Sequence, residues 1–161
     1  MPHPLLRSAA LMLLALAPAW TLAAGTMEVV FVHPDSYTDL GETQDGRDQA
    51  LVVLTEHLQK MAERLPQGLR LRLEITDIDL AGSPNPALAE NVRQFSGGGD
   101  RPQIKLRYLL RAGEQTLKSG EANIYNVNYL QHRRPTYQGV RELVHERRML
   151  DDWFDSNFKD R

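Results

Sequence analysis

The sequence predicts an α+β fold, a two-layer sandwich in which two helices cover one face of a four-stranded mixed sheet. Segments 69–75 and 104–111 alternate strictly between apolar and polar residues, as strands covered on one side do. The longer segments 47–65 and 139–158 place apolar residues on one stripe at helical spacing. With two further strands, the predicted order along the chain is β-α-β-β-β-α.

The first strand is expected at residues 27–33, a run rich in β-branched residues that ends at Pro34. Because apolar residues fall on both of its faces, we expect this strand at the centre of the sheet. A loop over residues 33–46 leads to the first helix, which ends before Pro66-Gln67-Gly68. A helix between two strands makes a crossover, so the first two strands are predicted to run parallel.

The second half of the chain predicts a hairpin and a second helix. Strands at 104–111 and 116–124 flank a short turn, the arrangement of a β-hairpin. The last helix carries Val140, Leu143, Val144, Leu150, Phe154 and Phe158 on its apolar stripe. Residues 79–102 have no clear period and contain three prolines and three consecutive glycines. We therefore expect a long loop there, either functional or mobile.

Residues 1–24 are predicted to be a cleavable signal peptide. Arg7 precedes an apolar run at 9–17, which Pro18 and small residues separate from Gly25. The run is too short to span about 30 Å of hydrocarbon, so no transmembrane anchor is expected. The chain has no cysteine, which excludes a thiol-linked lipid anchor. Export without disulfides favours a periplasmic location, with residues 25–161 as a single globular domain.

Composition excludes several classes of function. Without cysteine the chain has no disulfide scaffold, thiol nucleophile or iron–sulfur cluster. The formal net charge of −2 argues against a nucleic-acid binder. Charge is uneven, since residues 25–100 hold 13 acidic and 6 basic residues and residues 101–161 hold 8 and 12. Either the two halves attract each other, or the second half presents a basic face to an anionic partner.

Asp77 and Asp79 form the first candidate site. They continue the inward phase of the strand before them, and burial of an unpaired carboxylate is very costly. Either the strand bulges, so that Ile78 and Leu80 take the inner face, or the carboxylates meet partners. An Asp-x-Asp pair at a strand end suits Ca²⁺ or Mg²⁺, with Asp39 or loop carbonyls as further ligands. The alternative is a turn in which the carboxylates cap backbone N–H groups or pair with arginine. No other cofactor is expected.

Arg147 and Asp151 are the second candidate pair. They lie one turn apart on the apolar stripe of the last helix, where they would form a buried ion pair. An arginine that orients an anionic ligand is the functional alternative.

An aromatic and basic set follows the predicted hairpin and extends into the last helix. Tyrosine and arginine together are typical of binding surfaces. The same side chains could instead cover the sheet edge and the flank of the helix. The members of the set are Tyr125, Tyr129, Arg133, Arg134, Tyr137 and Trp153.

Several motifs together carry a family resemblance. They are Phe31-Val-His-Pro-Asp35 with Tyr37-Thr-Asp39, Thr76-Asp-Ile-Asp-Leu-Ala-Gly82, Ile104-Lys-Leu-Arg-Tyr108, Gly120-Glu121 and Arg148-Met-Leu-Asp-Asp-Trp-Phe154. The chain resembles the bacterial family known as domain of unknown function 3016 over nearly the whole mature length. The family has no assigned activity, so the resemblance implies an exported, small, single-domain protein and adds no mechanism. The 85–101 loop and Tyr125-Asn-Val-Asn-Tyr129 depart from the family pattern.

These observations favour a non-catalytic periplasmic module that binds an envelope protein or a small ligand. The expected surface combines residues 79–102 with residues 125–137. The alternative is a divalent-metal-binding protein or metal-dependent enzyme centred on Asp77 and Asp79. A purely structural envelope protein is a third hypothesis.

Overall fold

The computed structural model describes residues 25–85, 87–88, 91–97, 99–131, 137–139 and 142–159. The predicted signal peptide lies outside these residues. Within them, neither helix combines the length and the apolar content that a membrane crossing requires.

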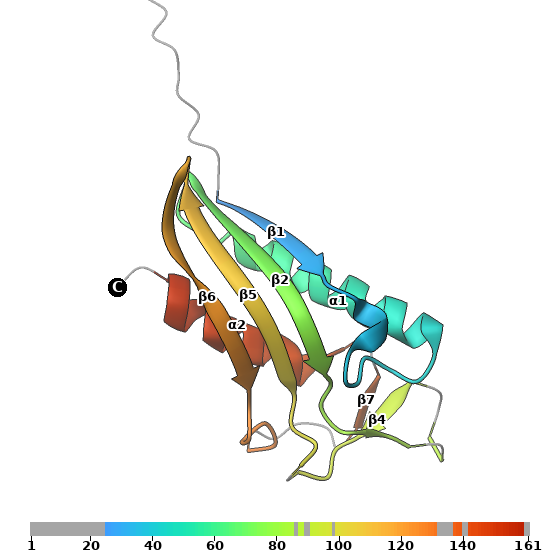
Figure 1. The fold of residues 1–161 in the computed structure, drawn as a ribbon. Coiled ribbons are helices and arrows are strands. Elements are labelled where there is room, and N and C mark those ends of the chain that lie inside the picture. The colour runs from blue at the N-terminus through green and yellow to red at the C-terminus, as the bar shows by residue number, and fades with distance from the viewer. Residues whose placement is uncertain are drawn as a thin grey trace, which may run out of the picture.

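The main layer is a four-stranded mixed sheet, as the sequence predicts. Its spatial order is β1-β2-β5-β6, with β1 at Thr26–Phe31, β2 at Leu69–Asp79, β5 at Gln103–Ala112 and β6 at Gln115–Tyr125 (Figure 1). The first two strands run parallel, and the remaining neighbours run antiparallel.

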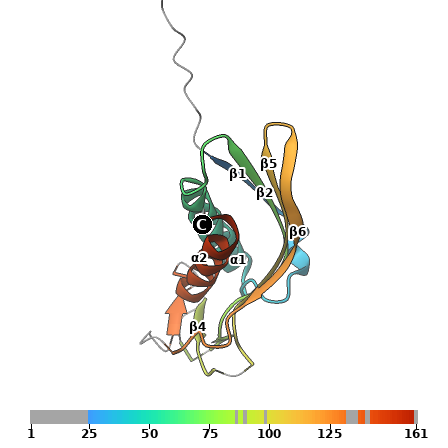
Figure 2. The same cartoon turned by 90° about the vertical axis from the view of Figure 1, so that its left-hand side faces the viewer.

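Two helices form the second layer and cover one face of the sheet (Figure 2). Helix α1 spans Gln44–Ala62 and packs against β1, whereas α2 spans Val144–Phe158 and packs against β6. This arrangement confirms the predicted two-layer α+β fold. The core contains the alternating side chains of the strands and the stripes of the helices; its fully buried members include Leu54, Leu58, Met61, Leu71, Leu73, Ile75, Ile104, Leu106 and Phe154. Burial of each such side chain stabilises the fold by about 1.5–3 kcal/mol.

The predicted central position of the first strand is wrong. β1 is an edge strand, because it stands first in the order β1-β2-β5-β6 and pairs on one side with β2. Met27, Val29 and Phe31 pack on the core. The other face of β1 carries Glu28, whose carboxylate forms an ion pair with Arg72 at 2.8 Å on the open side of the sheet. A charged side chain such as that of Glu28 is stable only where water reaches it. The helices therefore cover only one face of β1.

The helix starts also differ from the predictions. Helix α1 begins three residues earlier, because the Thr43 hydroxyl accepts a hydrogen bond from Gly46 N at 3.0 Å and caps it. Helix α2 begins later, at Val144, since residues 137–139 form strand β7. A 3₁₀ turn at Pro34–Ser36 lies within the predicted 33–46 loop.

A second sheet replaces much of the predicted 79–102 loop. Strands β3 (Ser83–Pro84), β4 (Val92–Gln94) and β7 (Tyr137–Gly139) form a three-stranded antiparallel sheet. In Figure 1, β4 and β7 lie at the end of the molecule where β2 ends. The expectation of a 24-residue loop without structure is therefore wrong for these segments, because pairing with a distant strand supplies order that no local period reveals.

A bulge in β2 decides where the paired aspartates point. The register with β5 shifts between Ile75 and Asp77. Ile78 and Leu80 are then fully buried, at 0% and 1% exposure. This is the first of the two arrangements considered for the Asp-x-Asp segment, and it keeps both carboxylates out of the apolar core.

Candidate functional site

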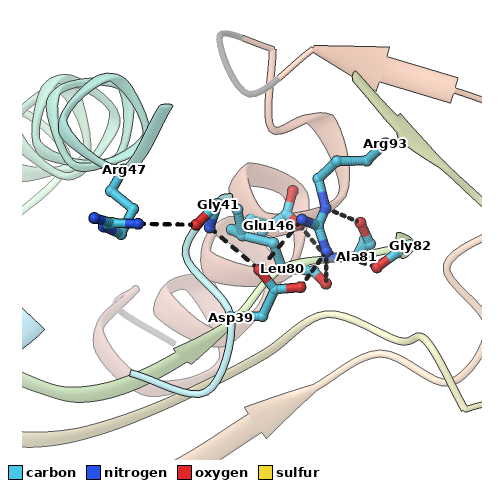
Figure 3. Close-up of polar contacts among 8 residues, drawn as sticks. All are labelled: Asp39, Gly41, Arg47, Leu80, Ala81, Gly82, Arg93 and Glu146. Carbon is cyan, nitrogen blue, oxygen red and sulfur yellow. Dashed lines mark hydrogen bonds and ion pairs between the residues drawn. The ribbon is translucent and has the colours of Figure 1, made fainter. Parts of the chain in front are cut away.

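The largest fully buried polar side chain is Arg93, in the middle of β4, with 1% of its surface exposed. Its guanidinium donates to three successive carbonyl oxygens: Ala81 O at 2.8 Å, Gly82 O at 2.6 Å and Leu80 O at 3.2 Å. It also binds the Asp39 carboxylate through both of its terminal nitrogens, at 2.6 and 3.3 Å. Figure 3 shows these contacts converging on one side chain. The fork of an arginine suits this task, because it offers several donors in fixed directions.

The Arg93 contacts join the two sheets. Asp39 lies in the segment between β1 and α1, where it forms an isolated bridge with Asp79. The backbone of Ala81 is held a second time, since Ala81 N donates to the buried Glu146 carboxylate of α2 at 2.7 Å (Figure 3). The nitrogens of the Arg93 guanidinium all donate to groups of the protein itself, so these contacts serve the fold.

The Asp77 carboxylate is bound by neighbouring groups of the protein. Its carboxylate accepts hydrogen bonds from Thr38 N at 2.8 Å, from the Thr38 hydroxyl at 3.0 Å and from Lys105 Nζ at 2.9 Å. Burial alone would raise the pKa of Asp77, but the hydrogen bonds from Lys105 and Thr38 hold it below its ordinary value of 3.8.

Asp79 has the opposite electrostatic setting. Burial raises its pKa above 3.8, and the negative charges of Asp39 and Asp77 raise it further. Within the described residues, no group of three or more histidine, cysteine or acidic side chains could hold a metal ion. Two of the three predicted Ca²⁺ or Mg²⁺ ligands are thus bound to basic side chains, Asp39 to Arg93 and Asp77 to Lys105.

A polar hollow of about 330 Å³ lies beside Asp39, lined by the segment between β1 and α1 and by Arg47 of α1. Arg47 lines it and donates to Gly41 O, Glu42 O and Gln44 Oε1. This arginine is therefore used to hold the loop before α1. The other charged residues that line the hollow are Asp35 and Asp39, and Asp39 is bound to Arg93.

The predicted aromatic and basic set is divided between core and surface. Tyr129 is 4% exposed and packs edge-to-face against Phe95 and His145. Its hydroxyl donates to the Asp100 carboxylate at 2.6 Å, and burial followed by this bond raises the Tyr129 pKa. Tyr129 therefore serves to fix the turn after β6. Arg133, Arg134 and the side chain of Tyr137 lie outside the described part of the structure.

Tyr125 and Trp153 do come together, in a hollow of about 370 Å³ between the end of β6 and α2. We call it the β6–α2 groove. Tyr125 is 53% exposed, and the Arg101 guanidinium lies 5.1 Å from its ring centre. Trp153 is held from behind by edge-to-face contacts with Tyr108 and Phe158. The groove is lined by Ile124, Tyr125, Asn126, Met149, Asp152, Trp153, Ser156 and Asn157.

The β6–α2 groove brings aromatic, amide and acidic side chains together. Asp152 is the charged residue among the lining side chains, and its side chain is 69% exposed. Arg148, one turn earlier in α2, forms an ion pair with it at 3.9 Å. Aromatic rings, amides and one exposed carboxylate on a rigid strand and helix offer stacking, hydrogen bonds and charge together.

Two further hollows, of about 370 and 410 Å³, lie on the open face of the sheet. Their charged side chains largely pair with one another, since Arg72 and Arg107 both bind Glu74 at 3.1 Å. Exposed pairs of this kind contribute little free energy and leave little net charge for a ligand.

The ion pair predicted between Arg147 and Asp151 of α2 is replaced by contacts with the α1 side. Asp151 pairs with Arg64 at 2.5 Å and with His57 at 3.3 Å, both from the α1 side, rather than with Arg147. The Asp151 side chain is 37% exposed, so the pair lies at the surface of the helix interface. Arg147 instead contributes its carbonyl oxygen, to which His57 Nε2 donates at 3.0 Å.

Sequence reasoning missed Arg93 and Asp152. Arg93 lies in a segment without any period, and nothing local marks an arginine as buried. Asp152 lies one residue before Trp153, and both line the same groove.

The fold and the sites define a small α+β protein with a helix-covered mixed sheet, an arginine-centred second sheet and a groove at the sheet edge. The chain belongs to the family described as protein of unknown function (DUF3016), whose model matches residues 25–156. This confirms the resemblance seen in the sequence.

Other comparisons add little. No curated protein matches the chain. Among solved structures, the chain is similar to "a putative lipoprotein" from Caulobacter crescentus CB15, with 15% identity over 81% of this chain and 90% of that one. The TM-score is 0.26, which is too low to establish a shared fold.

Proposed function

We propose that the protein is an exported, non-catalytic binding module and that its partner or ligand occupies the β6–α2 groove. The observation that carries this proposal is the groove itself, where Tyr125, Trp153 and the exposed Asp152 carboxylate meet on rigid elements. The sequence supports export, since residues 1–24 have the charged start, apolar run and small residues of a signal peptide.

Part of the predicted surface is replaced in this proposal. Segment 79–102 contributes β3, β4 and the buried Arg93, and these serve the fold. The end of β6 and the outer side of α2 provide the exposed aromatic and acidic groups instead. No described set of metal ligands favours the metal-dependent alternative.

Export is tested by expressing the full chain in a Gram-negative bacterium and sequencing the amino terminus of the periplasmic product. We expect a new terminus at Ala24 or Gly25. An intact Met1 terminus in the cytoplasmic fraction would contradict export.

Groove binding is tested by tryptophan fluorescence. The chain has two tryptophans, Trp20 and Trp153, so the mature form carries a single one, and it lies in the groove. We would titrate the mature form with soluble peptidoglycan fragments, lipid vesicles and synthetic peptides. A true ligand shifts the Trp153 emission, and at 100 times its Kd it stabilises the fold by about 2.7 kcal/mol.

The control variants separate the groove from the rest of the surface. Tyr125→Ala and Asp152→Asn should weaken binding at least tenfold. Val52→Ala changes a side chain that is 56% exposed on α1 and should leave binding unchanged. A ligand that binds all three variants equally would place the site elsewhere and refute the proposal.

A further inference from the structure

We propose that the partner is an extended peptide segment that joins the sheet as a fifth strand beside β6 and places a basic side chain in the β6–α2 groove. This inference rests on the proposed function and names the class of partner.

The first observation is an open sheet edge. β6 is the last strand in the order β1-β2-β5-β6, and no described segment pairs with its free side. It is 11 residues long, whereas the opposite edge strand, β1, has six. An exposed edge of this length is a template for strand addition.

The phase of the β5–β6 ladder shows which backbone groups are available. Asn126 N donates to Pro102 O at 3.3 Å, in register with the paired residues Ile104 and Ile124. Because hydrogen-bonded pairs alternate in an antiparallel ladder, the even-numbered residues of this part of β6 bond to β5. The N–H and C=O groups of Ser119, Glu121, Asn123 and Tyr125 therefore point away from the sheet, towards an incoming strand.

The usual protection of an edge strand is only partial here, with Glu121 as the exposed charged residue of β6. Natural edges carry proline, bulges or charged side chains that obstruct pairing. Residues 118–125 contain no proline, and the register shift of the hairpin lies near its turn, at Leu110 and Arg111. The only lysine of β6, Lys118, is turned towards α2, where it donates to Asn157 O and Oδ1 at 3.2 and 2.9 Å.

Exposed apolar side chains occur at both ends of β6 and in the turn that follows it. Six large hydrophobic side chains are exposed among the described residues, and four of them belong to β6 or to the turn that follows it. These four are Leu117, Tyr125, Val127 and Leu130, at 37–58% exposure. Apolar side chains of an added strand would cover such surface and contribute free energy by burial.

The groove specifies the side chain that the peptide places there. Every second residue of an added strand faces the helix side of the sheet, where α2 forms the far wall of the groove. The charged residue lining that wall is Asp152, beside the ring of Trp153. A lysine or arginine would pair with this carboxylate and stack on the ring, so a basic residue flanked at alternate positions by apolar residues fits best.

The experiment selects peptides from a random 12-residue display library on the mature chain, residues 25–161. Selected peptides are synthesised, and their Kd is measured from Trp153 emission. We expect sequences that alternate apolar residues with one lysine or arginine. Hydrogen exchange at the amides of Glu121 and Asn123 should slow at least tenfold when such a peptide binds.

Asn123→Pro is the decisive variant, with Asn123→Ala as its matched control. Proline removes an outward N–H but leaves the bonds to β5, which an edge strand tolerates. We expect Asn123→Pro to weaken binding at least tenfold and Asn123→Ala less than twofold. Asp152→Lys should reverse the selection, favouring an acidic residue over a basic one. If Asn123→Pro unfolds the chain, peptides N-methylated at alternate positions test the same bonds on the native protein.

Each other outcome overturns the inference. Equal binding by Asn123→Pro and Asn123→Ala would exclude strand addition, while loss of binding in Asp152→Asn would still support the groove. Failure to select any peptide would also overturn the peptide inference. A change of Trp153 emission with peptidoglycan fragments or vesicles would in that case support the proposed groove binding without strand addition. A dimer that Asn123→Pro abolishes in sedimentation would identify the occupant as a second copy of the chain.

Discussion

Replacement of Arg93 by methionine should destabilise the protein strongly. The variant keeps a long side chain but removes every donor from a group with 1% exposure. The carbonyl oxygens of Leu80, Ala81 and Gly82 each lose a hydrogen bond, and the Asp39 carboxylate loses its cation.

The size of the effect follows from these losses. A buried acceptor left without a partner costs about 1–3 kcal/mol, and loss of one partner from a buried ion pair costs about 3–5 kcal/mol. The two values overlap, because one guanidinium makes all of the bonds and Asp39 remains 30% exposed. We therefore expect a loss of about 3–5 kcal/mol rather than the sum, or a Tm lowered on the order of 10 °C.

Urea unfolding followed by far-UV circular dichroism measures this loss. Arg93→Lys keeps the charge without the planar fork and should fall between the native chain and Arg93→Met. In a double-mutant cycle, Asp39→Asn should cost much less in the Arg93→Met background than in the native one. A loss below about 1 kcal/mol, or full additivity in the cycle, would refute the assignment of Arg93 as the bond between the two sheets.

Three further predictions concern other parts of the fold. At pH 7, Asp77→Asn should lower stability, whereas Asp79→Asn should raise it, because the Asp79 pKa is raised by burial and by neighbouring carboxylates. In urea titrations, the gain in stability should vanish below about pH 3.8, where Asp79 is protonated in both the folded and the unfolded state. A Tm rise of the native chain with Ca²⁺ that is lost in both variants would contradict this account. Burial lowers the pKa of His57 below 6.5 more than Asp151 raises it, so stability should fall as the pH drops below about 6.5; an NMR titration of the ring that gives a value above 6.5 would refute this. Gly82→Ala should cost more than Gly68→Ala in thermal unfolding, because both have positive φ but only at Gly82 would a Cβ meet a backbone oxygen, at 2.5 Å; equal losses would show that the contact relaxes.

Much of the fold could be predicted from local patterns. The alternation that buries Leu71 and Leu73 defines β2, and the helical stripe through Leu54 and Leu58 defines α1. These patterns are local because one neighbouring layer covers each element, and side-chain periodicity reports which face is covered.

Positions within the sheet could not be predicted in the same way. The run of residues 27–33 predicted a central strand, yet β1 is at the edge, since sequence order does not state how many neighbours a strand has. The ion pair expected along α2 was replaced by contacts of Asp151 with Arg64 and His57 on the adjacent helix, which no i,i+4 spacing reveals.

By itself, the sequence determined the fold class, the family, the parallel first strand pair and the two arrangements open to the Asp-x-Asp segment. Only the tertiary structure decided that β2 bulges, that Arg93 is buried against Asp39, and that Tyr125 and Asp152 share one groove while Tyr129 enters the core. The physical reason is the distance along the chain between the residues that interact. Periodicity follows from the backbone geometry of a few consecutive residues, whereas burial of a charge depends on partners that the chain brings from more than 50 residues away.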